Sequence, residues 1–383
     1  MHAIRATGMA SLALAACLAS PPAAPAGNAA PDAISPGEAG PRAIEDPGQG
    51  IRSMHSPWPG TVELSGLTWV QADRWLAVSD RMATIHALDV SLDAAGRVSE
   101  ASVHAGVRLE GARDPEGVAY APESAAVFVS DEVGPAIREY EPATGRLLRQ
   151  VPVPAIFAGT RHNLGFESLT RDPATGVSWT ANEEALASDG PSADAVAGTL
   201  VRLQRFDRDW QPDGQWAWRT EPLRPGGKGT TGVSDLVALP DGGLLVLERS
   251  FGDRGVHVSL WEADLGSAPE VQAIPALGRD TPVLRKRLLW EAETGRFDFE
   301  GAALGPSLRD GGRALLLVSD DGRGGEFGLY PLVLRPSADA RRPPAHRSTT
   351  NARTGAAGGV AGPRSRPRPR VRRLQDTGGL LTP

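Results

Sequence analysis

One pattern recurs five times along the chain and constrains its fold more than any other feature. Each copy has an acidic or small residue near its start, crosses a short apolar run and a turn, and has one or two acids or an acid beside an arginine near its end. The copies span residues 64–81, 114–132, 165–184, 232–250 and 298–321. Aligned on Ser65, Glu116, Glu167, Ser234 and Glu300, they are separated by 51, 51, 67 and 66 residues. Such spacing is typical of four-stranded propeller blades with outer loops of variable length.

The residues within the repeats favour strands over helices. Apolar runs at 126–130, 244–247 and 314–318 are short and bounded by turn-forming residues, and no stretch keeps a helical period for long. The chain has 383 residues, of which 40% are hydrophobic, which is enough for a large core. We therefore predict an all-β protein in which residues 51–335 form a β-propeller, with five blades legible in the sequence.

The first 17 residues are typical of a bacterial export signal. His2 and Arg5 precede the apolar run MASLALAA, which is too short to span a bilayer. The run leads to LAAC, which resembles the lipobox of bacterial lipoproteins and makes Cys17 the lipidated residue. The alternative is an ordinary signal peptide cut at a later alanine. Both predict export, to the periplasm or to the outer membrane or cell envelope of a bacterium, with any membrane contact made through Cys17.

The lipobox interpretation has a direct test in the chain's single cysteine. We expect Cys17→Ala to release the protein from the membrane fraction, because the substitution removes the site of lipid attachment. Fractionation of cells that express the parent or the variant measures this. A variant that stays in the membrane fraction with the parent would contradict the lipoprotein hypothesis.

Two segments outside the repeats differ from them in composition. Residues 18–50 are rich in Ala, Pro and Gly and are typical of a tether. Residues 336–383 contain ten arginines against Asp339 and Asp376, in a chain whose net charge is −6. This Arg-, Pro- and Gly-rich tail is predicted to be disordered, and because it has no aromatic residue for base stacking we expect no nucleic-acid partner.

The acids at the two ends of each repeat are predicted to meet at one mouth of the propeller. The first strand of a blade lines the central channel and the second runs antiparallel to it, so the start of one and the end of the other share a rim. A slip of one residue would turn any of these side chains to the other face. The candidate catalytic acids are Glu116, Glu167, Glu183 and Glu300, and the candidate metal ligands are Asp80, Asp131, Asp235, Glu248, Asp320 and Asp321.

A ring of carboxylates repels itself unless something neutralises it. Ca²⁺ takes six to eight oxygen ligands and is the cofactor we expect, whereas the alternative is that these acids end hairpins and bond backbone amides or arginines. A carboxylate near a bound ester is suited to take a proton from the attacking water. Arg81, Arg161 and Arg249 are candidates to bind an anionic substrate, together with Asn163 in the segment that follows Arg161.

Five motifs in order resemble a known family. They are DPEGVAY (114–120), NLGFESLT (163–170), GVSDLVAL (232–239), LVLERSF (245–251) and FEGAALG (299–305) followed by LLVSDD (316–321). They are similar to the phytase-like, esterase-like family of bacterial propeller proteins, over roughly residues 60–334. The resemblance implies a calcium-dependent hydrolase of phosphoesters or carboxylesters, and it leaves room for a sixth, degenerate blade at residues 256–291. Asp298, Ser168 and Gly322 depart from the pattern that the family leads us to expect.

Two other functions fit the same sequence. One is a non-catalytic propeller, tethered at the cell envelope, that binds a partner or ligand. The other is a calcium-dependent sugar lactonase, also built on a propeller. Acids that converge on a gap of cation size would favour hydrolysis, and acids that point outward would favour docking. For the hydrolase we expect a monomer that acts on a small-molecule ester.

Overall fold

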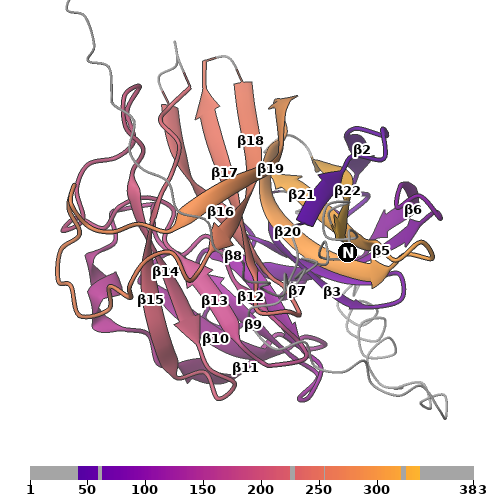
Figure 1. Ribbon diagram of the computed structural model, residues 1–383. Helices are drawn as coiled ribbons and strands as arrows, with labels where there is room; N and C mark the ends of the chain where they lie inside the picture. The colour runs from indigo at the N-terminus through magenta and orange to yellow at the C-terminus, as the bar shows by residue number, and fades with distance from the viewer. Residues whose placement is uncertain (1–41, 59–62, 225–228, 254, 321–324, 337–383) are drawn as a thin grey trace, which may run out of the picture. The chain divides into compact units, whose positions relative to one another are not determined.

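The computed structural model describes residues 42–58, 63–224, 229–253, 255–320 and 325–336. Cys17, the predicted signal peptide and the tail at 337–383 lie outside these residues. The described part is almost entirely β-structure and forms five sheets, one for each repeat, in a five-bladed propeller arrangement (Figure 1). The all-β prediction and its five blades are confirmed. A short 3-10 helix, η1 (Ala155–Gly159), interrupts the strands, and no helix in the described ranges is long and apolar enough to cross a membrane.

Four sheets are built from consecutive strands. The first contains β3 (Leu64–Gln71), β4 (Arg74–Ser79), β5 (Thr84–Leu92) and β6 (Val98–Val103), with β7 (Val107–Arg108) paired to β5. The second contains β8 (Pro115–Ala121), β9 (Ala126–Asp131), β10 (Ala136–Glu141) and β11 (Arg146–Val151). The third contains β12 (Thr170–Arg171), β13 (Ser178–Ala181), β14 (Leu200–Phe206) and β15 (Pro212–Arg219). The fourth contains β16 (Gly229–Ala238), β17 (Leu244–Gly252), β18 (Gly255–Asp264) and β19 (Arg285–Gly295).

The fifth sheet joins the two ends of the described chain. Its strands β20 (Asp298–Ser307), β21 (Arg313–Asp320) and β22 (Glu326–Pro336) come from the C-terminal side, and β1 (Arg42–Glu45) and β2 (Arg52–His55) both pair with β22. Residues 42–45, which we had assigned to the tether, are therefore part of the propeller. The strand is only four residues long, and Ile44 is its one large apolar residue. A pattern this short does not distinguish an edge strand from a linker.

The segment at 256–291 does not form a sixth blade. It contributes most of β18 and β19, which pair with each other and, through β17, belong to the fourth sheet. The two long repeat intervals, 67 and 66 residues, are thus accounted for by long loops and long outer strands.

The five first strands, β3, β8, β12, β16 and β20, lie next to one another around the propeller axis. Their alternate apolar residues and those of the second and third strands are buried between neighbouring blades. Between the first and fifth sheets, for example, Trp75 has no exposed surface and packs in one cluster with Leu316 and Val318. This packing fixes the first strands at the axis.

Three glycines allow these first strands to approach closely. A Cβ atom on Gly66 would lie 2.4 Å from the carbonyl oxygen of Glu116, and one on Gly301 would lie 2.1 Å from that of Ser65. On Gly117 it would lie 2.2 Å from the backbone nitrogen of Leu169. We call this level of the propeller the constriction, because backbone of neighbouring blades meets backbone there. The need for this close backbone approach explains why the sequences SGL (65–67), EGV (116–118) and EGA (300–302) each contain a glycine.

We expect Gly117→Ala to destabilise the protein by about 3 kcal/mol, because the added methyl group overlaps backbone that has no free direction in which to move. Gly278→Ala is the matched control, since its Cβ meets nothing within 4 Å, and it should change stability by less than about 0.5 kcal/mol. Urea unfolding of both variants measures the difference. Equal stabilities would show that the first strands are not held as closely as described.

Candidate functional site

Six carboxylates from three neighbouring blades form two groups at one end of the first strands. The first acidic group is Asp80, Asp114 and Glu116, and the second acidic group is Glu132, Glu167 and Glu183. Within each group the ligand oxygens lie within 4.8 Å of one another. Asp114, Glu116 and Glu167 lie at or just before the first strand of a blade, whereas Asp80, Glu132 and Glu183 follow the second strand. The hairpin geometry therefore brings both ends of a repeat to one rim, which we call the acidic mouth.

Glu132 connects the two groups. Its carboxyl is hydrogen-bonded to those of Asp114 and Glu167, and its Oε1 accepts the backbone N–H of Gly165 at 3.0 Å. Two carboxyl groups can share a hydrogen bond only when one of them carries a proton. Without a metal, the acidic mouth therefore retains protons that ordinary carboxylates lose.

Arg249 of β17 extends the acidic mouth to the fourth and fifth blades. Its guanidinium lies 2.7 Å from Oε1 of Glu183, 2.8 Å from Oδ2 of Asp298 and 3.2 Å from Oε1 of Glu300. The side chain is 13% exposed, so these ion pairs are largely shielded from water. Glu183 belongs both to this cluster and to the second acidic group, and thus lies between a fixed cation and the other carboxylates.

Burial raises the pKa of every carboxyl in the two groups. It raises the pKa of Asp80 to about 6. Burial, with the negative charges of Glu300 and Asp80, holds the pKa of Glu116 well above its usual range, and burial with Glu116 and Glu183 does the same for Glu167. For Glu183, burial raises the pKa to about 7 although Arg249 opposes the shift. Protons or cations are therefore needed to stabilise this site at neutral pH.

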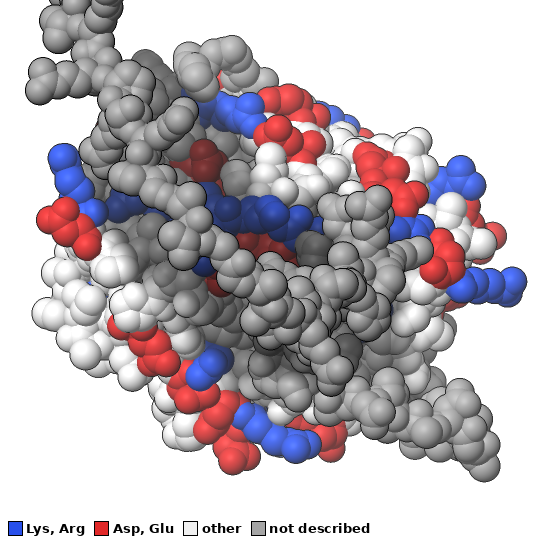
Figure 2. All heavy atoms as spheres, in the orientation of Figure 1, with Lys and Arg blue, Asp and Glu red and all other residues white. Residues whose placement is uncertain are grey.

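Most carboxylates of the acidic mouth have no cationic partner. In the described ranges, no Arg, Lys or His lies within 4.0 Å of the carboxylates of Asp80, Asp114, Glu116, Glu132 or Glu167. On the outer strands, by contrast, several acids form ion pairs, as in Arg285 with Asp264 at 2.7 Å. Figure 2 likewise shows acidic and basic side chains next to one another on the face drawn. A cluster of buried, unpaired carboxylate oxygens is the ligand set of a hard divalent cation.

The family of the chain follows from a match over most of the propeller. The model of the phytase-like family, described as esterase-like activity of phytase, matches residues 59–322. The chain belongs to the phytase-like family. This confirms the resemblance that the five motifs suggested. No curated protein matched the sequence.

Solved structures resemble this phytase-like protein only distantly. The PQQ-bound aldose sugar dehydrogenase from Streptomyces coelicolor is 15% identical, with 78% of this chain and 100% of that chain covered and a TM-score of 0.38. Streptogramin B lyase is 11% identical, with 76% and 98% covered and a TM-score of 0.32. Hydrazine synthase from Kuenenia stuttgartiensis is 12% identical, with a TM-score of 0.35. The match covers 70% of this chain but only 58% of hydrazine synthase. At these TM-scores the likeness carries no information on activity.

Two predicted ligands of this phytase-like protein have partners outside the two acidic groups. Asp131 accepts a hydrogen bond from Nη1 of Arg138 at 2.5 Å and one from the backbone N–H of Arg113 at 2.9 Å. Glu248 contacts Nε1 of Trp218 at 2.7 Å and Nζ of Lys286 at 2.8 Å. In both strands the next residue, Glu132 or Arg249, reaches the acidic mouth instead, so the assignment was displaced by one position.

Asp235 is fully buried and bonds backbone amides. Its Oδ1 accepts the N–H of Leu236 at 2.8 Å and its Oδ2 accepts the N–H of Ala302 at 2.7 Å, which links β16 to β20. Asp235 therefore helps to hold β16 and β20 together. Its contacts explain why the fourth blade has an acid at the position that is Gly66, Gly117 and Gly301 in other blades. Asp320 ends β21 opposite Asp298, and Asp321 lies outside the described residues.

The rim of the acidic mouth contains another acid that sequence reasoning missed. Glu63 is 3% exposed, has a φ of 59° and forms an ion pair with Arg81. Arg81, a predicted substrate ligand, is exposed apart from this contact. A non-glycine residue with positive φ is strained and is often found at functional sites. Nothing in the residues around Glu63 indicates this conformation.

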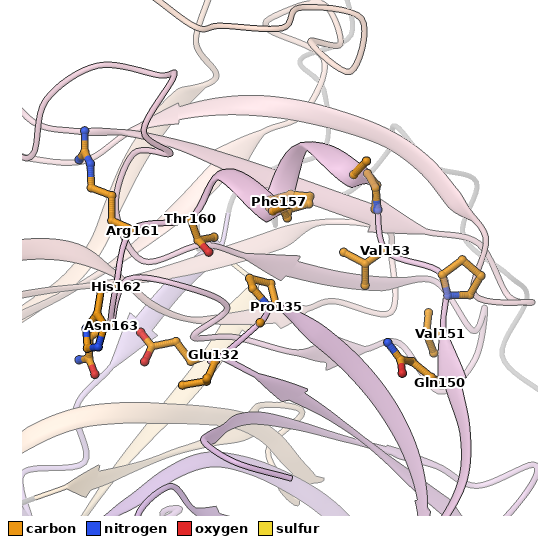
Figure 3. Close-up of a pocket in the computed structure, with 16 residues that line it drawn as sticks. Glu132, Pro135, Gln150, Val151, Val153, Phe157, Thr160, Arg161, His162 and Asn163 are labelled. Atoms are coloured by element: carbon orange, nitrogen blue, oxygen red, sulfur yellow. The ribbon is translucent and has the colours of Figure 1, made fainter. Parts of the chain in front are cut away.

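A cavity of about 720 Å³ opens beside Glu132. Figure 3 shows Glu132 on its wall together with the predicted substrate ligands Arg161 and Asn163. Nη1 of Arg161 lies 3.4 Å from Oγ of Ser192, and Nη2 donates to the carbonyl of Gly190, so the guanidinium is held in place. The remaining wall is largely apolar and comes from Pro135, Val151, Val153, Pro154 and Phe157. The cavity has the volume of a small-molecule site and touches the second acidic group directly.

Proposed function

We propose that this phytase-like protein is an exported, calcium-dependent hydrolase that acts on phosphoester or carboxylester bonds at the acidic mouth. The observation that supports this most strongly is the convergence of six carboxylates, five of them without a cationic partner in the described part of the chain. Acids that serve only to end hairpins would bond backbone amides, as Asp235 does. Convergence also favours an ion-binding mouth over a docking face.

The donor set fits calcium better than other common metals. All six groups offer carboxylate oxygens, whereas zinc and copper sites are usually built with His or Cys. Oδ1 of Asp80 is buried without a hydrogen-bond partner, as expected of an oxygen that lacks its ligand. The first acidic group, with Glu132 and Glu167 of the second, would hold the metal, which leaves Glu183 free to act on water. When bound, Ca²⁺ would supply charge that polarises the ester and stabilises the developing negative oxygen.

The remaining chemistry is assigned to residues of the chain. Glu183 is the candidate general base, because its pKa near 7 allows it to take a proton from water at neutral pH. Arg249 orients Glu183 through the ion pair at 2.7 Å. The cavity beside Glu132 would hold the substrate, with Arg161 and Asn163 available to its polar groups and the apolar wall to its organic part. Glu116, Glu167 and Glu300 contribute further negative charge to the acidic mouth.

The proposal is tested by assay of the purified full-length protein. We would compare p-nitrophenyl phosphate with p-nitrophenyl acetate and butyrate, each in Ca²⁺, Mg²⁺ and EDTA. Hydrolysis of one series that requires Ca²⁺ supports the proposal and identifies the bond that is cleaved. A wider panel of phosphoesters, carboxylesters and sugar lactones follows if the nitrophenyl esters are not cleaved. Absence of turnover on the whole panel would favour the non-catalytic, envelope-tethered propeller.

A further inference from the structure

A second cavity lies at the opposite ends of the five first strands. Its volume is about 240 Å³, and every blade contributes to it. Its wall includes Leu67 of β3, Val118 of β8, Thr170 of β12, Val237 of β16 and Ala303 of β20. Each of these residues follows the repeat's first acidic or aligned position by two or three residues, and a strand rises about 3.3 Å per residue. We call it the distal cavity.

The constriction separates the distal cavity from the acidic mouth. Gly117 lies between Glu116 of the first acidic group and Val118 of the distal wall, and Gly301 lies between Glu300 and Ala302 in the same way. Backbone from adjacent blades packs against both glycines. The two ends of the propeller axis are therefore distinct sites, one acidic and one mainly apolar.

Two arginines line the distal cavity, and they differ in their partners. Arg171 forms an ion pair with Glu123 and donates to Oγ of Ser178 at 3.0 Å. Arg313 donates from Nε and Nη2 to the carbonyl oxygen of Gly305, at 3.2 and 2.8 Å. Throughout the described ranges, no carboxylate lies within 4.0 Å of Arg313, and its Nη1 has no hydrogen-bond partner.

A guanidinium without a counterion is costly in an apolar wall. Burial lowers the pKa of Arg313, and Asp172 opposes this only through its charge at longer range. Arginine nevertheless stays protonated at neutral pH, so a positive charge remains in the cavity. The oxygens of Asp172 are occupied by the backbone and side chain of its own turn, including Oγ1 of Thr175 at 2.6 Å. The charge of Arg313 is therefore available to a ligand.

We propose that the distal cavity binds a small organic monocarboxylate with an apolar body. Its carboxylate would pair with Arg313, and its hydrocarbon part would contact Leu67, Val118 and Val237. The volume equals about eight water molecules at ~30 Å³ each, which suits a single aromatic ring or a short aliphatic chain. The acidic mouth would repel the same ligand in the absence of metal. This site is independent of the proposed hydrolase activity.

Calorimetric titration of the full-length protein in EDTA tests the proposal, with benzoate as the probe. Benzyl alcohol and benzylamine have the same ring but no negative charge. We expect benzoate to bind at least tenfold more tightly than either, and Arg313→Met to remove this preference. Arg309→Met is the matched control, because Arg309 is exposed on the turn four residues earlier, and it should bind benzoate as the parent does.

The outcomes separate a site from a structural role. Arg313→Met removes a charge that has no acidic partner among the described residues, so its melting temperature should stay close to that of the parent. If that variant does not fold, Arg313→Lys keeps the charge and should retain benzoate binding, more weakly because the planar fork is lost. Benzoate that binds equally well to the parent and to Arg313→Met would overturn the proposal. Equal binding of benzoate and benzyl alcohol, or no benzoate binding to the parent, would do so as well.

Discussion

Glu183→Gln is expected to lower turnover of the best ester substrate by about 10² to 10⁴-fold, which is the usual contribution of a general base. The variant should fold normally. Burial already favours the neutral form of this carboxyl, and Gln has the same shape and no charge. Arg249 keeps Asp298 and Glu300 as partners at 2.8 and 3.2 Å. Steady-state kinetics and thermal unfolding of the same preparation measure both effects.

Glu248→Gln is the matched control for this experiment. Glu248 is also an acid from the second strand of a blade, but it bonds Trp218 and Lys286 rather than the acidic mouth. Its loss should leave turnover within about threefold of the parent and reduce stability by about 1 to 3 kcal/mol, since buried donors lose a charged acceptor. If Glu183→Gln keeps parental turnover and instead loses stability, the carboxylates of the acidic mouth are structural.

Calcium is expected to stabilise the protein far more at pH 8 than at pH 5. At a free concentration one hundred times Kd, binding to the folded state alone adds about 2.7 kcal/mol to the free energy of unfolding. Protons compete with the cation for the carboxylates, so this gain should shrink as the pH falls. Melting curves at a series of pH values, with Ca²⁺ or with EDTA, measure it. Mg²⁺ is the control, because it keeps its water ligands and requires a tighter octahedral site.

The metal-free protein should show the opposite dependence on pH. Its raised pKa values are about 6 for Asp80, against an ordinary 3.8, and about 7 for Glu183, against 4.5. Between roughly pH 4 and 7 the folded state therefore binds more protons than the unfolded chain, and the free energy of unfolding falls as the pH rises. A melting temperature in EDTA that rises from pH 5 to pH 7, or a calcium response that does not change with pH, would contradict the site as proposed.

The repeat pattern predicted the fold because it reports a local property. Each copy contains a hairpin whose apolar residues alternate and whose ends carry polar residues. One blade follows another along the sequence, so the repeats give the blades in order. What the pattern missed are contacts between distant segments. β1 is recognisable only once β22 is in place, and the segment at 256–291 joins the fourth sheet through pairing with β17.

Prediction of the acidic mouth was limited because successive side chains of a strand face opposite sides, so an error of one residue selects the wrong side chain. Glu116, Glu167, Glu183 and Asp80 were placed on the rim from sequence, and the structure brings them together in two groups. Asp131 and Glu248 were predicted as metal ligands and Arg249 as a substrate ligand, whereas Glu132 and Arg249 are the side chains that reach the carboxylates of the acidic mouth. A bulge or the end of a strand decides which of two adjacent side chains faces the axis. The register of β8 with β9 shifts between Pro115 and Val118, and that of β16 with β17 between Val233 and Asp235. Neither shift has a signature in the residues themselves.

The joining of both ends of the domain in one sheet sets the order in which this protein can fold. Four blades consist of strands that follow one another, so each can form as soon as its own segment has been synthesised. The fifth requires contacts such as Arg335 with Glu45, which are 290 positions apart in the chain. Until those contacts form, β22 has an unpaired edge and the ring remains open. We therefore expect closure of the ring to be a late folding step, because β1 and β2 can pair only after β22 has been synthesised.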